Sequence, residues 1–134
     1  MFQSASYRVL DVNLNECKGS GANFIKSVFK ESSFAGCLFP YANFSESAWQ
    51  NCDIKETSFK DSFLNEVSFK KTDFYKVDFT RADFFKTMLK GLDLSGCTIA
   101  GIVLSDGKRE LLGCKVNVFQ AAEIARLLGV IIKY

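Results

Sequence analysis

Residues 67–84 read VSFKKTDFYKVDFTRADF, and a Phe recurs at every fifth position of this stretch. The spacing continues in both directions, so that 17 consecutive positions from Phe24 to Leu104, taken five apart, hold a large apolar residue. Helices have a period of 3.6 residues and strands a period of 2, so neither explains a period of five. An unbroken period over most of a chain predicts a repeat architecture in which each unit stacks on the next.

A second column of residues supports this frame. A smaller residue stands two positions before each large one, as Ala42 stands before Phe44. Residues two apart on an extended backbone share a face, so each unit is expected to point one small and one large side chain inward. The residue between them faces out, and the last two residues of the unit turn the corner. The frame also runs backward, less regularly, through the pairs Cys17/Gly19, Val12/Leu14 and Tyr7/Val9.

Three units in this frame, Ala22-Asn23-Phe24, Ala42-Asn43-Phe44 and Ala82-Asp83-Phe84, resemble the A(D/N)LXX motif of the pentapeptide repeat family. The resemblance covers residues 7–106 and implies the family's fold, a right-handed quadrilateral β-helix with four five-residue faces per coil. We therefore expect an all-β solenoid of about five coils over residues 22–106. Residues 1–21 would form an N-terminal cap and imperfect first coil, and residues 107–134 a C-terminal helix-strand cap and dimerisation module.

The C-terminal cap has its own sequence signals. Residues 117–128 are predicted to form a helix, with Asn117 as the N-cap and Gly129 as the stop, followed by a short strand at 130–132. Because the open end of a solenoid exposes unpaired strand edges, such a cap is expected on physical grounds alone.

The cap also resembles a known module. Segment 112–117, together with Gln120, Ala121 and residues 127–129, is similar to the C-terminal module of the quinolone-resistance pentapeptide repeat proteins. In that group the module joins two protomers, so the resemblance implies a homodimer. The contact residues that it implies are Phe119, Ile124, Leu127, Leu128 and Ile131.

The cellular compartment is predicted from what the sequence lacks. It has neither a signal peptide nor an apolar run long enough to span a membrane, so we expect a cytoplasmic protein. Four of the five cysteines fall in the small inward column, where a free Cys acts as a small hydrophobe. Cys17 and Cys37 would stack on each other, but an interior position and a reducing compartment argue against a disulfide. Cys114, outside the column, is the more reactive candidate.

The residue types argue against catalysis. The chain contains no His, which excludes His-based triads and His metal sites, and it has no Gly-rich phosphate loop. The filled ladder leaves no interior pocket. We therefore predict no enzyme activity and no catalytic, cofactor or metal site. The net charge of +2 gives no support to nucleic-acid binding either.

Two surfaces are candidate binding sites, because residues 20 apart should stack on one wall. An acidic stripe would consist of Asp53, Asp73 and Asp93, with Asp78 on the next wall. These carboxylates have an alternative role, which is to bond local backbone while neighbouring lysines neutralise them. A partner surface would consist of Ile25, Phe63, Phe85 and Val103, with Met88 on the next wall, since contiguous exposed apolar residues mark interfaces. Two columns also suggest solvated ion pairs, Glu56 with Lys76 and Asp61 with Arg81.

Three functional interpretations follow. The first is a non-catalytic protein-binding scaffold with an unidentified partner. The second, taken from the resemblance, is a DNA-mimicking protein that binds gyrase, a type II topoisomerase, and protects it from quinolones. That mimicry requires a strongly negative surface, whereas residues 22–106 hold 10 Lys and Arg against 11 Asp and Glu. The third is a mainly structural module, which the sequence does not separate from the first.

Overall fold

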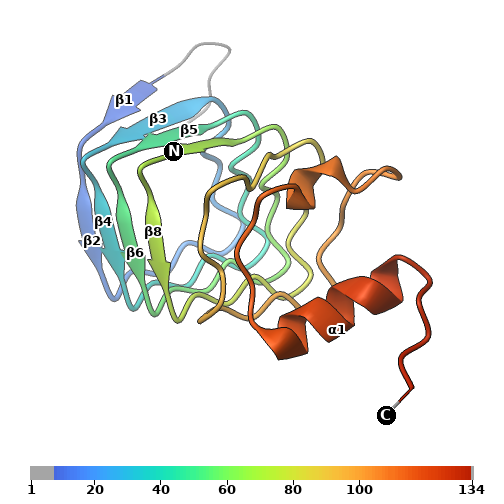
Figure 1. Ribbon diagram of the computed structural model, residues 1–134. Coiled ribbons are helices and arrows are strands. Elements are labelled where there is room, and N and C mark those ends of the chain that lie inside the picture. Colours follow the sequence, from blue (N-terminus) through green and yellow to red (C-terminus); the bar gives the residue numbers. More distant parts are fainter. Residues whose placement is uncertain (1–7, 134) are drawn as a thin grey trace.

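The computed structural model describes residues 8–133, which form a β-solenoid with a helix at its C-terminal end (Figure 1). Two of its walls are four-stranded parallel sheets. The first contains β1 (Arg8–Leu10), β3 (Ser27–Lys30), β5 (Ala48–Gln50) and β7 (Ser68–Lys70). The second contains β2 (Asn13–Asn15), β4 (Ser33–Ala35), β6 (Asp53–Lys55) and β8 (Asp73–Tyr75).

The other two walls are held by isolated parallel bridges between residues 20 apart, such as Ser58 with Asp78 and Phe63 with Asp83. Twenty residues per coil and five per unit give four walls. The right-handed quadrilateral β-helix expected from the sequence is therefore confirmed.

The inward columns form the core as expected. Every small-column residue from Ser27 to Ile102 is buried, and the large column is buried from Phe29 to Ile99 except at Phe69 and Phe74. Rings 20 residues apart stack along the solenoid axis, with centroids of Phe59 and Phe79 5.7 Å apart and their planes 9° apart. Each buried large side chain contributes roughly 1.5–3 kcal/mol.

The corners are turned by a repeated backbone conformation. From Glu16 to Gly91, the last residue of every unit has a positive φ, and most of these residues are not glycine. A non-glycine residue in this left-handed region costs about 1–2 kcal/mol. Ladder hydrogen bonds offset that cost; for example, Glu46, with φ 59°, donates its N–H to Asn65 O at 2.9 Å.

The N-terminal end departs from the predicted frame. β1 pairs with β3 one residue out of the 20-residue register, so Leu10 rather than Val9 lies beside Phe29. The prediction that Tyr7 and Val9 continue the inward columns is therefore wrong for Val9, which pairs with Val28. Tyr7 lies outside the described residues. Gly19 occupies the large column, as expected, and the Phe39 ring takes the vacant space. A Cβ at Gly19 would lie 2.9 Å from Phe39 Cδ1.

The C-terminal end of the ladder also departs from expectation. Residues 87–106 form a fifth coil that stays paired through Asp78 with Thr98 and Asp83 with Val103. Among the described residues, however, no strand continues the two sheets beyond β7 and β8. Asp93 pairs instead with Lys115, 22 residues further on. The part of the solenoid that is paired on all four walls is thus shorter than the five coils predicted.

The predicted C-terminal helix is present. A short 3₁₀ helix, η1 (Arg109–Leu111), precedes α1 (Val118–Leu127), which begins with a capping box between Asn117 and Gln120 and ends before Gly129 at φ 83°. The strand expected at 130–132 is wrong, because these residues pair with no neighbouring strand in the described chain. Val130 N–H bonds Ala125 O and so completes the helix end.

Candidate interaction surfaces

The C-terminal cap is fixed to the solenoid by polar side chains at the start of α1. Gln120 Nε2 donates to Leu94 O and to Cys97 O, both at 2.7 Å, and Asn117 Nδ2 donates to Ser95 O at 2.7 Å. Gln120 is buried, so losing these bonds would leave carbonyl groups unsatisfied away from water. The N-terminal end of α1 is therefore bonded to the last coil at three carbonyl groups.

Glu110 in η1 is a second anchor, and sequence reasoning missed it. Its side chain is fully buried, and its carboxylate accepts hydrogen bonds from Lys86 N–H at 2.8 Å, Ser105 N–H at 2.8 Å and the Ser105 hydroxyl at 2.9 Å. Burial alone would raise the pKa of Glu110, but the hydrogen bonds together outweigh it, so the pKa lies below its ordinary value. Glu110 follows Lys108 and Arg109 outside the repeat, and nothing in that local sequence indicates that its side chain is buried.

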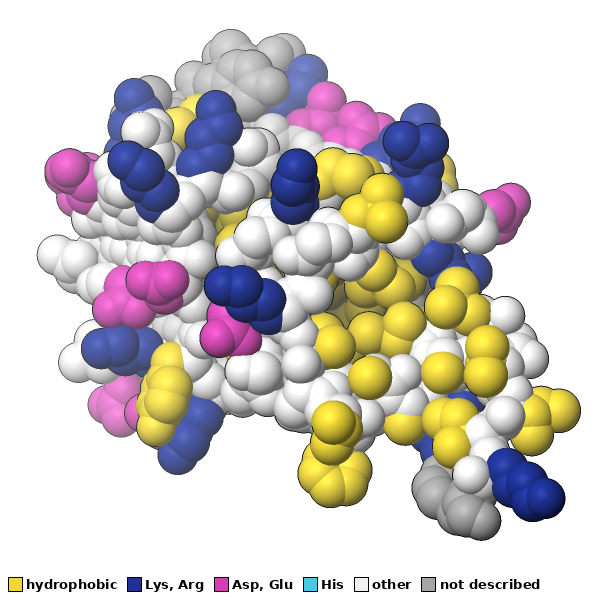
Figure 2. All heavy atoms as spheres, viewed as in Figure 1, with side chains coloured by type: hydrophobic (Ala, Val, Ile, Leu, Met, Phe, Trp, Pro, Cys, Tyr) yellow, Lys and Arg dark blue, Asp and Glu magenta, His cyan; other side chains and the backbone are white. Residues whose placement is uncertain are grey.

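The cap presents an exposed apolar surface, which we call the cap face. Phe119 is 81% exposed and Ile131 93% exposed, and Leu127 and Leu128 are also exposed. Figure 2 shows hydrophobic side chains gathered over α1 and the segment after it. Among the predicted dimer residues only Ile124 is half-buried. We use the name cap face for the exposed large apolar residues of the cap, which lie on more than one side of α1: Leu112, Val118, Phe119, Leu127, Leu128, Val130 and Ile131.

Sequence reasoning missed Leu112, Val118 and Val130 as members of the cap face. The available signal was that α1 is apolar on more than one side, which is typical of a helix covered on two faces. One side of α1 lies over the last coil, and the other is uncovered in a single chain.

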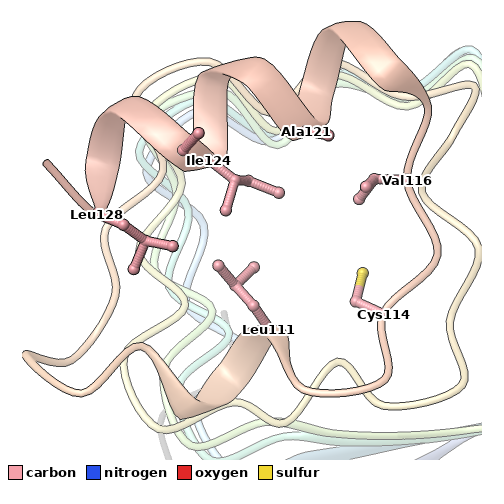
Figure 3. Close-up of a pocket in the computed structure, with 7 residues that line it drawn as sticks. Leu111, Cys114, Val116, Ala121, Ile124 and Leu128 are labelled. Carbon is pink, nitrogen blue, oxygen red and sulfur yellow. The ribbon is translucent and has the colours of Figure 1, made fainter. Parts of the chain in front are cut away.

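A hollow of about 250 Å³ opens in the cap, between α1 and residues 111–116 (Figure 3). Its lining is apolar, and three side chains point into it: Ile124 of α1, Leu128 directly after α1 and Leu111 of η1. The other lining residues are Cys114, Val116, Ala121 and Ala125. Burial raises the pKa of the Cys114 thiol to about 11, with a smaller contribution from Asp93. The hollow therefore suits an apolar side chain and not chemistry, and Cys114 is a protonated thiol at neutral pH.

The candidate partner surface on the walls is less contiguous than its members suggest. Phe63, Phe85, Val103 and Met88 are exposed, and Ile25 is half-buried. Phe63 and Val103 lie in one outward column with Asp83 between them. We call Phe63, Phe85 and Val103 the wall patch, because they share one wall. Met88 lies past the next corner, and Ile25 belongs to a coil two levels away.

The candidate acidic stripe is divided. Asp53 and Asp73 are direct neighbours between β6 and β8, but Asp93 pairs with Lys115 instead of continuing the column. Asp93 accepts the Ser95 N–H and hydroxyl, and Asp78 on the adjacent wall accepts the N–H of Thr80. These local bonds lower the pKa of Asp93, the Ser95 hydroxyl most of all. The arrangement corresponds to the alternative in which the carboxylates hold local backbone.

The remaining charges are also paired locally or dispersed. Arg81 Nε donates to Asp61 Oδ1 at 2.7 Å and its second nitrogen to Asp61 Oδ2 at 3.0 Å, as expected from their column. No ion pair joins Glu56 and Lys76 in the described chain; Lys76 instead lies over the Tyr75 ring. Figure 2 shows basic and acidic side chains interspersed on the visible face.

Residues 8–133 contain neither a cluster of metal ligands nor a membrane-spanning helix. In that range no group of three or more His, Cys, Asp or Glu side chains is placed to hold a metal ion. No helix in the same range is long and apolar enough to cross a membrane.

Comparison with known proteins identifies the repeat. The family model for pentapeptide repeats matches residues 20–54 and 64–101, in eight copies. No curated protein sequence is similar enough to match this chain.

Solved structures resemble the chain in fold. HetL from the cyanobacterium Nostoc sp. strain PCC 7120, a pentapeptide repeat protein involved in heterocyst differentiation regulation, is similar at a TM-score of 0.63 and 12% identity over 77% of this chain. The match covers 46% of HetL, so the chain spans about half of that protein's length. Full-length QnrB1, a plasmid-mediated fluoroquinolone resistance protein, has 14% identity over 92% of this chain and 100% of its own, with a TM-score of 0.31. The HetL likeness shows the fold alone, and the QnrB1 score is too low to support an argument.

Proposed function

The chain belongs to the pentapeptide repeat family, and from that premise we propose that it is a non-catalytic scaffold. In this proposal the cap face joins two copies of the chain, and the walls bind a protein partner in the cytoplasm. The five unpaired cysteines are compatible with a reducing compartment. Exposure of the cap face is the observation that carries the proposal.

Two properties of the cap face favour a second copy as its occupant. A two-fold contact uses the same surface on both protomers, so that surface must supply both projecting groups and a space to receive them. The cap supplies the projecting side chains of Phe119 and Ile131 and, on another side of α1 from Phe119, an apolar hollow of about 250 Å³. The seven members of the cap face are uncharged, and the charged Glu123, four residues from both Phe119 and Leu127 on α1, is half-buried.

The experiment is a mass measurement in solution by multi-angle light scattering, on the wild-type chain and on Phe119→Asp and Ile131→Asp variants. Truncating an interface anchor typically costs at least about 2 kcal/mol, or roughly thirtyfold in dissociation constant. We expect a dimer for the wild type and monomers for both variants. Met88→Asp, at an exposed position outside the cap, is the matched control and should remain dimeric. A monomeric wild type at micromolar concentration would contradict the proposal.

The partner surface rests on the wall patch. Changing Phe63 and Phe85 together to Ser removes most of its apolar area without touching the core, since both side chains are exposed. We expect partner binding to be lost while the mass of the dimer is unchanged. Because the contact is apolar, binding by the wild-type wall patch should vary little with salt. Partner binding that survives the double substitution would remove the wall patch from the proposal.

Gyrase binding by DNA mimicry is the alternative, and the charge distribution does not favour it. The acidic column is interrupted at Asp93, and residues 22–106 are close to neutral. A supercoiling assay with and without a quinolone separates the two proposals, because inhibition that weakens steeply with salt would indicate mimicry. We expect no effect of the folded protein in this assay.

A further inference from the structure

Residues 88–96, which we call the strap, face β7 and β8 without pairing to them. In the regular part of the solenoid the middle residue of a unit donates its N–H one coil back, as Asp73 does to Cys52 O at 3.0 Å. The following large residue donates one coil forward, as Phe44 does to Phe63 O at 2.8 Å. Neither type of bond joins β7 or β8 to the strap in the described chain.

Two complementary strand edges are therefore unpaired and face each other. On one side are the N–H groups of Phe69 and Phe74, and on the other those of Met88 and Asp93. The opening also reaches the core, because Phe69 and Phe74 are half-buried whereas Phe79 and Phe84, which follow them in the same coil, are each 1% exposed. A backbone N–H that is buried without a partner is unfavourable, and so is a core ring that remains in contact with water.

The strap keeps the register that pairing would need. Thr87 and Leu89, like Leu92 and Leu94, hold the small and large positions in phase with the rest of the chain, and all four are buried. Both ends of the strap are already fixed in that register. Val67 N–H donates to Thr87 Oγ1 at 2.9 Å before it, and Thr98 N–H donates to Val77 O at 3.0 Å after it.

The cap bonds the other edge of the strap, the edge that faces away from β7 and β8. Leu89 N–H donates to Glu110 O and Leu94 N–H to Lys115 O, both at 2.9 Å. Ser95 O accepts Asn117 Nδ2 at 2.7 Å, whereas in a regular coil this oxygen would accept the N–H of Lys76, as Tyr75 O accepts that of Glu56. Asn117 at the N-cap of α1 thus bonds the same oxygen that Lys76 N–H would bond in a paired strap.

The backbone of Gly96 also differs from that of the regular corners. It is the first corner residue after Glu16 whose φ is not positive, and an added Cβ there would meet nothing within 4 Å. Glycine adopts both signs of φ without a steric penalty, so Gly96 can serve both the present conformation and a regular corner.

We propose that the strap closes onto β7 and β8, and that closing exchanges the Asn117–Ser95 bond for the Lys76–Ser95 bond. The strap is thus a two-state element whose position is coupled to the anchorage of the cap. In the open state Phe69 and Phe74 are accessible from the side of the solenoid, and in the closed state they are covered by Leu89 and Leu94.

The test is disulfide cross-linking of Asp73→Cys with Asp93→Cys, which would be direct neighbours only in the closed state. Paired strand positions bring two outward Cβ atoms within reach of a disulfide. The control pair is Asp78→Cys with Thr98→Cys, which is already bridged. We expect the strap pair to cross-link at a rate within about tenfold of the control pair, a difference of about 1.4 kcal/mol. No cross-link in a folded protein whose control pair does react would overturn the proposal.

Two further substitutions test the coupling. Asn117→Asp keeps the oxygen that caps α1 but removes the donor to Ser95 O, so it should speed cross-linking of the strap pair. Gly96→Ala disfavours the left-handed corner that closing requires and should slow it roughly tenfold, or about 1.4 kcal/mol. If Asn117→Asp leaves the rate unchanged, the strap moves independently of the cap and the coupling is wrong.

Discussion

Replacement of Glu110 tests whether a buried carboxylate holds the cap to the solenoid. Glu110→Ala would leave three donors, the N–H groups of Lys86 and Ser105 and the Ser105 hydroxyl, without a partner in a buried site. Each unsatisfied buried donor costs about 1–3 kcal/mol. Allowing for partial access of water after truncation, we expect a loss of about 3–5 kcal/mol, a large part of the 5–15 kcal/mol typical of a domain.

Glu110→Gln isolates the contribution of the charge. An amide oxygen can still accept from the two N–H groups while its nitrogen donates to the Ser105 oxygen, so only charge assistance is lost. Hydrogen bonds to a charged group exceed neutral ones by about 1 kcal/mol each, which predicts a loss of about 2–3 kcal/mol at neutral pH. Urea unfolding followed by far-UV circular dichroism measures both variants. Glu46→Gln, at an exposed corner, is the matched control and should change stability by less than about 0.5 kcal/mol.

The pH dependence of the same variant gives an independent check. Because the pKa of Glu110 is lowered by folding, its contribution is complete above the ordinary Glu pKa of about 4.3 and is lost as pH falls through the folded value. The stability difference between wild type and Glu110→Gln should therefore be constant above that range and shrink below it. Equal stability of the two proteins at pH 7 would refute the assignment of Glu110 as an ionised anchor.

Four other predictions address the core, the cap, a corner and a thiol. Phe44→Ala removes a fully buried ring that contacts Phe24 and Trp49, and should cost about 3–5 kcal/mol in urea unfolding. Gln120→Ala breaks the capping box and both bonds to the last coil, so amide hydrogen exchange in α1 should accelerate while exchange in the regular coils does not. Gly21→Ala, at φ 67° with open space around it, should cost about 1 kcal/mol through backbone strain alone; an unchanged midpoint would contradict this. Cys114, with a pKa of about 11, should react with iodoacetamide at pH 8 on the order of a hundredfold slower than a free thiol.

The fold was predictable because the position of a residue within its five-residue unit decides whether its side chain points inward or outward. The spacing of Ala42 and Phe44 already assigns both side chains to the interior, and a shift of 20 assigns their neighbours. Helix α1 was predictable for a different reason, since Asn117, Gln120 and Gly129 are local signals that act within a few residues.

The features that were not predicted depend on contacts outside the repeat. Glu110 is buried where its carboxylate accepts hydrogen bonds from Lys86 N–H and Ser105 N–H, and no local sequence pattern predicts these contacts. The prediction of a strand at 130–132 was wrong because these residues have no neighbouring strand edge to pair with, although their composition favours a strand. The strap has a regular repeat sequence but does not pair with β7 and β8, and its other edge bonds residues 110–115.

The register of 20 residues between bridged positions means that chain length sets the rotation of one part of this molecule against another. Inserting a whole coil upstream would lengthen the rod and leave the cap over the same wall. Inserting a single unit would keep every side chain correctly inside or outside, yet turn all downstream walls by a quarter revolution. Each five-residue unit inserted between the wall patch and the cap would therefore rotate the cap face by a further right angle relative to the wall patch, without repacking the interior.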